Sequence, residues 1–270
     1  MPEPIIRLRG ISKQFGRQPV LANVSFDVFP HETIALIGES GCGKSVTLKL
    51  IVGLLQPTDG EVYFEERPLR ARTEHDLTAM RQRVGFLFQQ AALFDSLSVF
   101  DNVAFGLRAK GGVAEDAIQK RVRERLQEVG LPATVEPKMP AELSGGMRKR
   151  VGLARALALD PDVMLYDEPT TGLDPIMTDV INELILRTRQ RRPVTSLVVT
   201  HELRTVHKVA DRVVMLYPLS RLPPGEPQVI YDGPPHGLAT CHDSRVRQFV
   251  EGEARERLTE MQVDFSEPEA

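Results

Sequence analysis

This chain of 270 residues has no tryptophan and only two cysteines, and it contains no long run of apolar residues. Two cysteines form no disulfide framework, which indicates a reducing compartment. No stretch approaches the roughly 20 apolar residues that a membrane-spanning helix needs. The N-terminus also lacks the pattern of a secretory signal peptide. We therefore expect a cytosolic chain without a membrane span of its own.

A strong excess of basic charge is also missing, because the net charge is −3 and no long basic run occurs. This balance argues against a nucleic-acid partner. The densest basic cluster, Arg-Lys-Arg at residues 148–150, is expected to be the solvated face of a helix. His236, Cys241 and His242 are irregularly spaced and have no evident fourth ligand, so we expect no metal site there.

What the chain does have is a phosphate-binding loop. Residues 38–45 read Gly-Glu-Ser-Gly-Cys-Gly-Lys-Ser, which fits the P-loop pattern. An apolar run at residues 33–37 precedes them and is typical of a buried parallel strand, and a helical pattern at residues 46–55 follows. The glycines let backbone N–H groups surround phosphate oxygens, and the helix N-terminus adds partial positive charge. Lys44 is expected to reach the β- and γ-phosphates, and Ser45 to ligate Mg²⁺.

Three further predicted strands end in polar side chains. Residues 84–88 precede Gln89, residues 162–166 precede Asp167-Glu168, and residues 196–199 precede Thr200-His201. Ligands of open parallel α/β sheets bind outside the carboxyl ends of the strands, so these side chains are expected to surround one nucleotide. The pattern predicts an α/β P-loop NTPase core with a mainly parallel sheet and flanking helices.

Two regions outside this core have other patterns. Residues 1 to about 30 alternate apolar and polar and, with Asp59-Gly60 as a turn before residues 61–64, predict an antiparallel β subdomain. Residues about 90–157 are expected to form an α-helical subdomain. An apolar stripe that stops at Gly130 is expected to be core packing there; it consists of Ile118, Val122, Leu126 and Val129.

Leu-Ser-Gly-Gly at residues 143–146 precedes a predicted helix at residues 147–159. Serine is a favoured helix N-cap, and a helix N-terminus beside glycines is an anion site. One chain holds only one P-loop, so a second phosphate site has no obvious use within it. The alternative, an ordinary capped helix, predicts that Ser144 has no effect on hydrolysis.

Together these motifs resemble the nucleotide-binding subunit of ABC transporters, from about Ile5 to about Met215. Residues 143–146 look like the family's signature sequence, and Gly-Leu-Asp at residues 172–174 looks like its D-loop. The resemblance implies an ATPase on the cytoplasmic face of the inner membrane, attached to an integral-membrane permease. It also implies that two copies meet head to tail with two ATPs between them, so that each signature serves the partner's ATP.

The resemblance implies ATP and Mg²⁺ as cofactors and a role for individual residues. Asp167 would hold Mg²⁺ with Ser45 and Gln89, and Gln89 would also touch the attacking water. Glu168 would be the general base, and His201 would bond the γ-phosphate. Phe15 would stack on adenine. The remaining nucleotide-binding residues implied are Gly38, Glu39, Ser40, Gly41, Cys42, Gly43, Lys44, Ser45, Val46, Ser144, Gly145, Gly146 and Asp174.

Cys42 lies inside the phosphate loop and leaves two interpretations open. The surrounding N–H groups and Lys44 would lower the pKa of the thiol and make it reactive. Alternatively, cysteine is simply a small residue that a tight loop tolerates.

Within the family, three stretches resemble the MlaF-type ATPases of phospholipid-transport systems. They are residues 86–94 with 99–105, residues 143–150 with Met147 after the two glycines, and residues 243–252. This resemblance implies an MCE-domain lipid-binding protein and a small STAS-domain subunit as further partners. An ABC importer or exporter for another substrate, such as amino acids, is the alternative. A soluble ABC protein acting on DNA or ribosomes would carry two cassettes or a long coiled coil, and this chain shows neither.

Three further segments carry expectations about surfaces and boundaries. Residues 92–103 are apolar and aromatic for a loop region, and part of them is expected to form the groove that receives the permease's coupling helix. The proline-rich residues 218–235 are expected to be an inserted loop. The charged tail from Glu251 is either a flexible end or a partner-binding arm. We divide the chain into an ABC ATPase domain at residues 1–240 and a C-terminal extension at residues 241–270.

Overall fold

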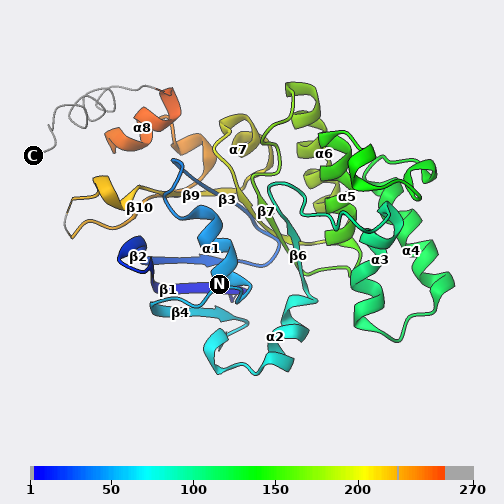
Figure 1. Cartoon of the computed structure of the whole chain (residues 1–270). Helices are drawn as coiled ribbons and strands as arrows, with labels where there is room; N and C mark the ends of the chain where they lie inside the picture. Colours follow the sequence, from blue (N-terminus) through cyan, green and yellow to red (C-terminus); the bar gives the residue numbers. More distant parts are fainter. Residues whose placement is uncertain (1–2, 224, 253–270) are drawn as a thin grey trace, which may run out of the picture.

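The computed structural model describes residues 3–223 and 225–252, and its core is a six-stranded sheet (Figure 1). The strand order is β10-β9-β3-β8-β7-β6, in which only β10 runs antiparallel to its neighbour. The four strands predicted to carry the site are therefore consecutive neighbours. The bounds are Thr33–Gly38 for β3, Val84–Leu87 for β6, Val163–Asp167 for β7, Thr195–Val199 for β8, Arg212–Leu216 for β9 and Val229–Gly233 for β10.

A second sheet is antiparallel, with the order β2-β1-β4-β5. Its strands are β1 (Ile6–Phe15), β2 (Gln18–Val28), β4 (Asp59–Phe64) and β5 (Arg67–Pro68). The predicted turn at Asp59-Gly60 is wrong, because both residues begin β4. A Cβ on Gly60 would lie 2.3 Å from the carbonyl oxygen of Gly10 in β1. Glycine is therefore required here for close approach of two strands rather than for a chain reversal.

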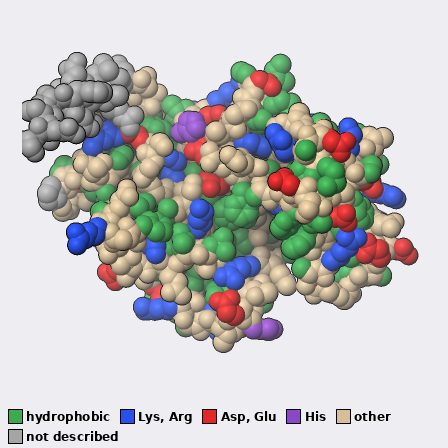
Figure 2. Space-filling view, viewed as in Figure 1, with side chains coloured by type: hydrophobic (Ala, Val, Ile, Leu, Met, Phe, Trp, Pro, Cys, Tyr) green, Lys and Arg blue, Asp and Glu red, His purple; other side chains and the backbone are tan. Residues whose placement is uncertain are grey.

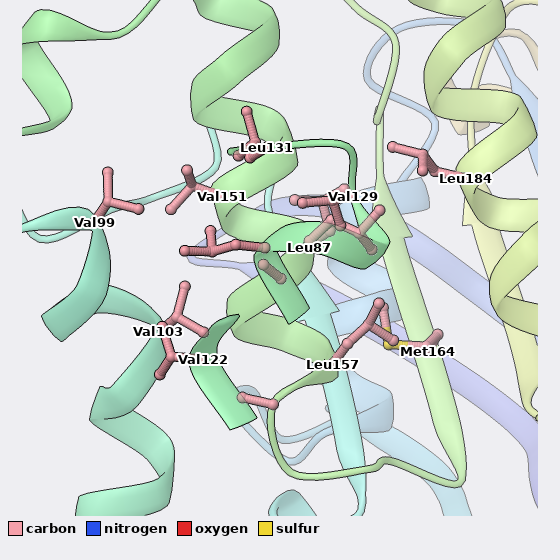
Figure 3. Close-up of a cluster of buried hydrophobic side chains, with 14 of the residues drawn as sticks. Leu87, Val99, Val103, Val122, Val129, Leu131, Val151, Leu157, Met164 and Leu184 are labelled. Carbon is pink, nitrogen blue, oxygen red and sulfur yellow. The ribbon is translucent and has the colours of Figure 1, made fainter. Parts of the chain in front are cut away.

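The predicted helical subdomain consists of α3 (Val99–Lys110), α4 (Glu115–Glu128) and α5 (Gly145–Leu157). Two short 3₁₀ turns, Ala133–Val135 and Pro140–Glu142, connect α4 to α5. The apolar stripe of α4 is buried throughout, which confirms that it packs into the core. Figure 3 shows its Val122 in the same cluster as Val103 of α3 and Leu157 of α5.

Helices also flank the parallel sheet: α1 (Lys44–Ile51), α6 (Pro175–Arg191) and α7 (Leu203–Val209). Helix α1 ends at Ile51, earlier than the predicted helix at residues 46–55. Gly53 has a φ of +66°, and Arg81 donates to the carbonyls of Val52 and Gly53 at 3.1 and 2.9 Å. Arg81 belongs to α2 (Glu74–Arg81), which follows a 3₁₀ turn at Leu69–Ala71.

The C-terminal part is more regular than the proline-rich sequence suggested. The expected loop at residues 218–235 contains a 3₁₀ turn (Leu219–Arg221), and β10 lies within it as an edge strand. A further 3₁₀ turn (Pro235–Gly237) leads to α8 (Ser244–Glu251), whose Val246 is buried against the sheet. Figure 1 places α8 at the opposite end of the molecule from α3 and α4. The expected tail beyond residue 252 lies outside the described residues.

None of the helices in the described ranges is both long enough and apolar enough to cross a bilayer. On the face shown in Figure 2, basic and acidic side chains are interspersed and hydrophobic side chains are visible between them. No patch of one charge sign dominates that face.

Candidate active site

A cavity of about 1030 Å³ lies where β3, β6, β7 and β8 reach their carboxyl ends. This is the edge at which parallel sheets bind ligands. One wall comes from the P-loop and the polar residues after the strands, and the other comes from α8. The wall on the P-loop side contains Val20, Glu39, Ser40, Gly41, Gly43, Lys44, Ser45, Val46, Gln89, Glu168 and His201.

The P-loop needs its glycines for steric reasons. Gly38 and Gly43 have φ angles of +140° and +98°. A Cβ on Gly38 would lie 2.2 Å from the carbonyl oxygen of Leu216, and one on Gly43 would lie 2.4 Å from the Leu21 side chain. The buried Lys44 ammonium donates to the carbonyls of Gly38 and Glu39 at 2.7 and 2.8 Å, so it is held over the loop.

Ser45, which lines the cavity, is paired with the buried Asp167 at the end of β7. The Ser45 hydroxyl donates to Asp167 Oδ1 at 2.7 Å across 122 residues of sequence. Burial raises the pKa of Asp167, while the bond from Ser45 opposes that rise. A hydroxyl and a carboxylate are hard oxygen donors, the type that Mg²⁺ prefers. The pair therefore fits the predicted magnesium site.

Glu168 is only 8% exposed and follows β7 directly. Its Oε2 accepts a hydrogen bond from the Thr171 hydroxyl at 3.0 Å and lies 2.9 Å from His201 Nδ1. The Glu168 backbone N–H donates to the carbonyl of Val199 in β8 at 2.9 Å. These bonds place a carboxylate and an imidazole side by side facing the P-loop. Gln89, after β6, is exposed at the same cavity.

The signature and D-loop lie elsewhere: no cavity-lining residue among those described belongs to either motif. Ser144 caps α5 by accepting from the Met147 N–H at 3.3 Å. Asp174 caps α6, accepting from the N–H groups of Ile176 and Met177 at 2.9 Å each. The two motifs lie close together, because a Cβ on Gly146 would lie 3.9 Å from Leu173 Cδ2 of the D-loop. Gly145, next to the cap, is exposed.

Phe15 also lies outside the lining of the cavity. It ends β1 with its ring 45% exposed, and the Lys13 ammonium lies 5.1 Å from the ring centroid. Stacking of this ring on adenine, which the family resemblance implies, stays a prediction.

The surroundings of Cys42 favour the interpretation that it is a small residue tolerated in a tight loop. The side chain is buried, and burial raises the pKa of its thiol although Lys44 opposes the rise. A buried thiol with a raised pKa is a poor nucleophile. Cysteine is therefore here as a small residue, its sulfur 2.9 Å from where a Cβ on Gly38 would be.

The predicted solvated cluster at residues 148–150 needs a correction, because Lys149 is buried while Arg148 is exposed. The second turn of α5 directs Lys149 toward β7, and its ammonium donates to the carbonyls of Glu168 and Thr171. Three consecutive residues on a helix point in different directions, so one of three consecutive charged side chains can face the interior.

Sequence reasoning missed Gln228, which is fully buried. Its amide N–H groups donate to the carbonyls of Val20 and Cys42 at 3.2 and 3.1 Å, and its oxygen accepts from the Ala22 N–H at 2.9 Å. It therefore joins β2 to the P-loop. A single glutamine in a proline-rich segment, 186 residues from Cys42, gives no local signal.

The α8 wall of the cavity was also unpredicted. Arg221 pairs with Glu39 of the P-loop, and Arg245 of α8 pairs with Glu226 at 2.6 Å. Both guanidinium groups lie over the Tyr217 ring, 5.0 and 5.1 Å from its centroid. The proline-rich segment thus connects the phosphate loop to α8.

Comparisons with known proteins agree with this geometry. The model of the ABC transporter family matches residues 21–171. The chloroplastic protein TRIGALACTOSYLDIACYLGLYCEROL 3 of Arabidopsis thaliana is 40% identical, over 92% of this chain and 74% of its own length. The intermembrane phospholipid transport system ATP-binding protein MlaF of Haemophilus influenzae is 38% identical, over 94% of this chain and 93% of its own.

Among solved structures, the chain is similar to the ATP-binding cassette MJ0796, a dimer in a post-hydrolysis state bound to ADP and Pi. The TM-score is 0.75 and the sequences are 31% identical, with 85% of this chain and 98% of that chain covered. The family match, the relatives and the solved structure all indicate an ATP-binding cassette. The chain therefore belongs to the ABC transporter family, as an ATPase that resembles the MlaF-type proteins.

Proposed function

We propose that this chain powers an ABC transport complex that moves phospholipids between membranes with an MCE-type system. The observation that carries the ATPase chemistry is the convergence of Ser45–Asp167 and Glu168–His201 on the cavity of the P-loop. The cargo is inferred from the similarity to MlaF, which extends over 93% of that protein. No described residue of this chain needs to touch the lipid for that role.

The site residues would act by positioning and by neutralising charge, which is the main work in phosphoryl transfer. The P-loop N–H groups and Lys44 would hold the β- and γ-phosphates. Glu168 would accept the proton of the attacking water, and His201, 2.9 Å from its carboxylate, would hold that water and the γ-phosphate in line. A magnesium ion held by Ser45 and Asp167, with Gln89 nearby, would neutralise phosphate charge.

The signature and D-loop support a head-to-tail homodimer. Both lie outside the cavity of their own chain, and the capped N-terminus of α5 presents Ser144 and Gly145 on the surface. A helix N-terminus of this kind binds anions. In the dimer it would contact the ATP of the partner, with Gly146 and Asp174 close by.

An aromatic groove supports docking to a membrane-spanning permease at the cytoplasmic face of the inner membrane. Phe94 and Phe105 are 42% and 47% exposed, and their ring centroids lie 4.6 Å apart. They border a cavity of about 260 Å³ with Phe86, Phe88 and Leu159. Exposed aromatic pairs beside a groove are typical of helix-binding surfaces. We expect the coupling helix of the permease to occupy it.

The substitution Glu168→Gln tests the catalytic role. The amide keeps the shape of the side chain but cannot accept a proton, so turnover is expected to fall about 10²-fold or more. Nucleotide binding is expected to stay within about twofold, because the P-loop supplies it. Steady-state phosphate release and binding of a fluorescent ATP analogue measure the two quantities. Near-normal turnover would remove Glu168 from the role of general base.

A pull-down of the tagged chain from its own membranes in mild detergent tests the partners and cargo. Mass spectrometry is expected to identify a permease together with an MCE-domain protein and a small STAS-domain subunit. Recovery of a permease with a small soluble binding protein would instead support transport of another substrate, such as amino acids, and would contradict the phospholipid proposal.

A further inference from the structure

Lys149 is a buried cation that the catalytic roles above leave unused. It is 6% exposed and lies in the second turn of α5, the helix that begins with the signature. Its ammonium donates to the carbonyl of Glu168 at 3.1 Å and to that of Thr171 at 2.8 Å. Burying an ammonium is costly unless such partners are present, so this position is specific.

The two carbonyls belong to the segment that leads from the general base into the D-loop. Glu168 has a φ of +49°, which is unusual for a residue with a side chain. Its N–H is held by Val199 of β8, while its carbonyl receives Lys149 and, at 3.3 Å, the Thr171 N–H. Lys149 of α5 therefore holds the carbonyl of Glu168, while β8 holds its N–H.

The ammonium is charged under ordinary conditions. Burial lowers the pKa of Lys149 to about 8, and the nearby carboxylates of Glu168 and Glu202 oppose that fall. Near pH 7 the side chain is mostly protonated, and both of its bonds are charge-assisted. Such bonds are stronger and more directional than bonds between neutral groups.

We propose that Lys149 is a positioning residue that fixes the backbone of Glu168 to the signature helix of the same chain. The inference rests on the proposed function of Glu168 as general base. Its distinctive consequence is that Lys149 acts on the ATP bound to its own P-loop. If it acted through Ser144 at the tip of α5, it would affect the ATP of the partner instead.

Homodimers give the first readout. Lys149→Met has similar length without the donors and is expected to lower kcat about tenfold with KM within about twofold, because a small displacement of the base slows the chemical step. Lys149→Arg retains a cation and donors and is expected to recover at least about half of the lost activity. An unchanged kcat in Lys149→Met overturns the proposal.

The matched control is Arg150→Met on the same helix. Arg150 is a partly buried cation that, like Lys149, donates to a backbone carbonyl, but its acceptor at 3.0 Å belongs to Gly130. A loss of kcat equal to that of Lys149→Met would show a general effect of loosening α5 and would overturn the proposal.

Heterodimers separate the two directions of action. Two differently tagged copies of the full chain are co-expressed, and dimers with both tags are isolated. One copy carries Glu168→Gln, so a single site turns over. Lys149→Met in the copy with intact Glu168 is expected to lower turnover about tenfold, and in the other copy by less than about twofold. The proposal is overturned if Lys149→Met in the copy that carries Glu168→Gln lowers turnover as much as, or more than, Lys149→Met in the copy with intact Glu168.

Both heterodimers contain the same two substitutions, so any loss of stability caused by Lys149→Met is common to both and cancels when their turnover is compared. The homodimer of Glu168→Gln separates this inference from the proposed function. If that homodimer retains turnover, the role of Glu168 itself is wrong. If it is inactive while Lys149→Met is normal, only the role of Lys149 is wrong.

Discussion

Glu168 shows how single residues of the site depend on their backbone. A side chain held at positive φ costs about 1–3 kcal/mol, so surrounding contacts must stabilise it. Here they come from Val199 of β8, from Lys149 of α5 and from Thr171 in the same turn. The carboxylate direction is thus set by three separate parts of the chain. Changes in any of them are expected to alter turnover before they alter nucleotide binding.

The buried Lys149 also makes stability depend on pH. Its pKa is about 8 in the folded chain and near 10.4 when unfolded, so the unfolded chain binds more protons between these values. Stability therefore rises with pH in that window. The free energy of unfolding of the native chain, relative to Lys149→Met, is expected to increase by about 2 kcal/mol from about pH 7.5 to about pH 9.5.

Urea unfolding of both proteins at the two pH values measures this difference, because the other titrating groups cancel between them. A gap that stays constant, or that narrows with rising pH, would contradict the ammonium burial described here. The difference in free energy of unfolding between the native chain and Arg150→Met is expected to stay constant over this pH range, because arginine does not lose its proton there.

At the scale of elements, a glycine lets two strands of the antiparallel sheet, β1 and β4, approach closely. Gly60 of β4 faces the backbone of Gly10 in β1, and its φ is +83°. Two requirements coincide at this position, a left-handed backbone and the absence of a side chain. This explains why a pair of residues that signals a turn in sequence stands inside a strand.

Gly60→Ala is therefore expected to destabilise the chain by about 3 kcal/mol, because the methyl group collides with a carbonyl and the φ angle is strained. Gly112→Ala is the matched control: its φ is +74°, but a Cβ there meets nothing within 4 Å. It is expected to cost about 1 kcal/mol. Thermal and urea unfolding compare the two, and equal losses would show that strain alone matters at Gly60.

At the scale of the whole molecule, the site is divided between two surfaces. Ser45, Gln89, Glu168 and His201 line the P-loop cavity, whereas none of its described lining residues belongs to the signature or the D-loop. In the proposed head-to-tail dimer, a second copy would bring a signature to each cavity. The helical subdomain holds both the signature helix and the rim of the aromatic groove, so movement of a permease at the groove would reach α5 through shared packing (Figure 3).

Phe105→Asp tests the groove at this scale. A carboxylate in place of an exposed aromatic side chain is expected to reduce recovery of the permease at least about tenfold, because apolar docking is lost. Binding of ATP to the isolated chain is expected to change by less than about twofold. The tagged pull-down and nucleotide titration measure both.

Val113→Asp serves as control for that experiment, since Val113 is an exposed hydrophobic residue in the connection between α3 and α4 and does not line the groove. Equal loss of the permease in both variants would mean that added charge, rather than the groove, is responsible.

Much of the active site was predictable because its motifs are local. Glycine positions, the lysine and the serine of residues 38–45 follow from the geometry of one loop, and polar residues after buried strands meet because parallel strands end at one edge. The sequence was less informative about element ends. The predicted helix at residues 46–55 ends four residues later than α1 does. After Ile51, Arg81 of α2 binds the carbonyls of Val52 and Gly53, and this distant contact has no signal in the local sequence.

What the sequence by itself determined, then, is the phosphate loop, the strand-end residues of the cavity and the presence of a separate helical subdomain. Only the tertiary structure decided that Lys149 is buried against Glu168 and that Gln228 reaches the P-loop. The physical reason is the sequence distance over which each feature is determined. A motif encodes backbone conformation and chemistry within a few residues, whereas the burial of a charge or an amide depends on which distant carbonyls the packed elements bring within hydrogen-bond distance.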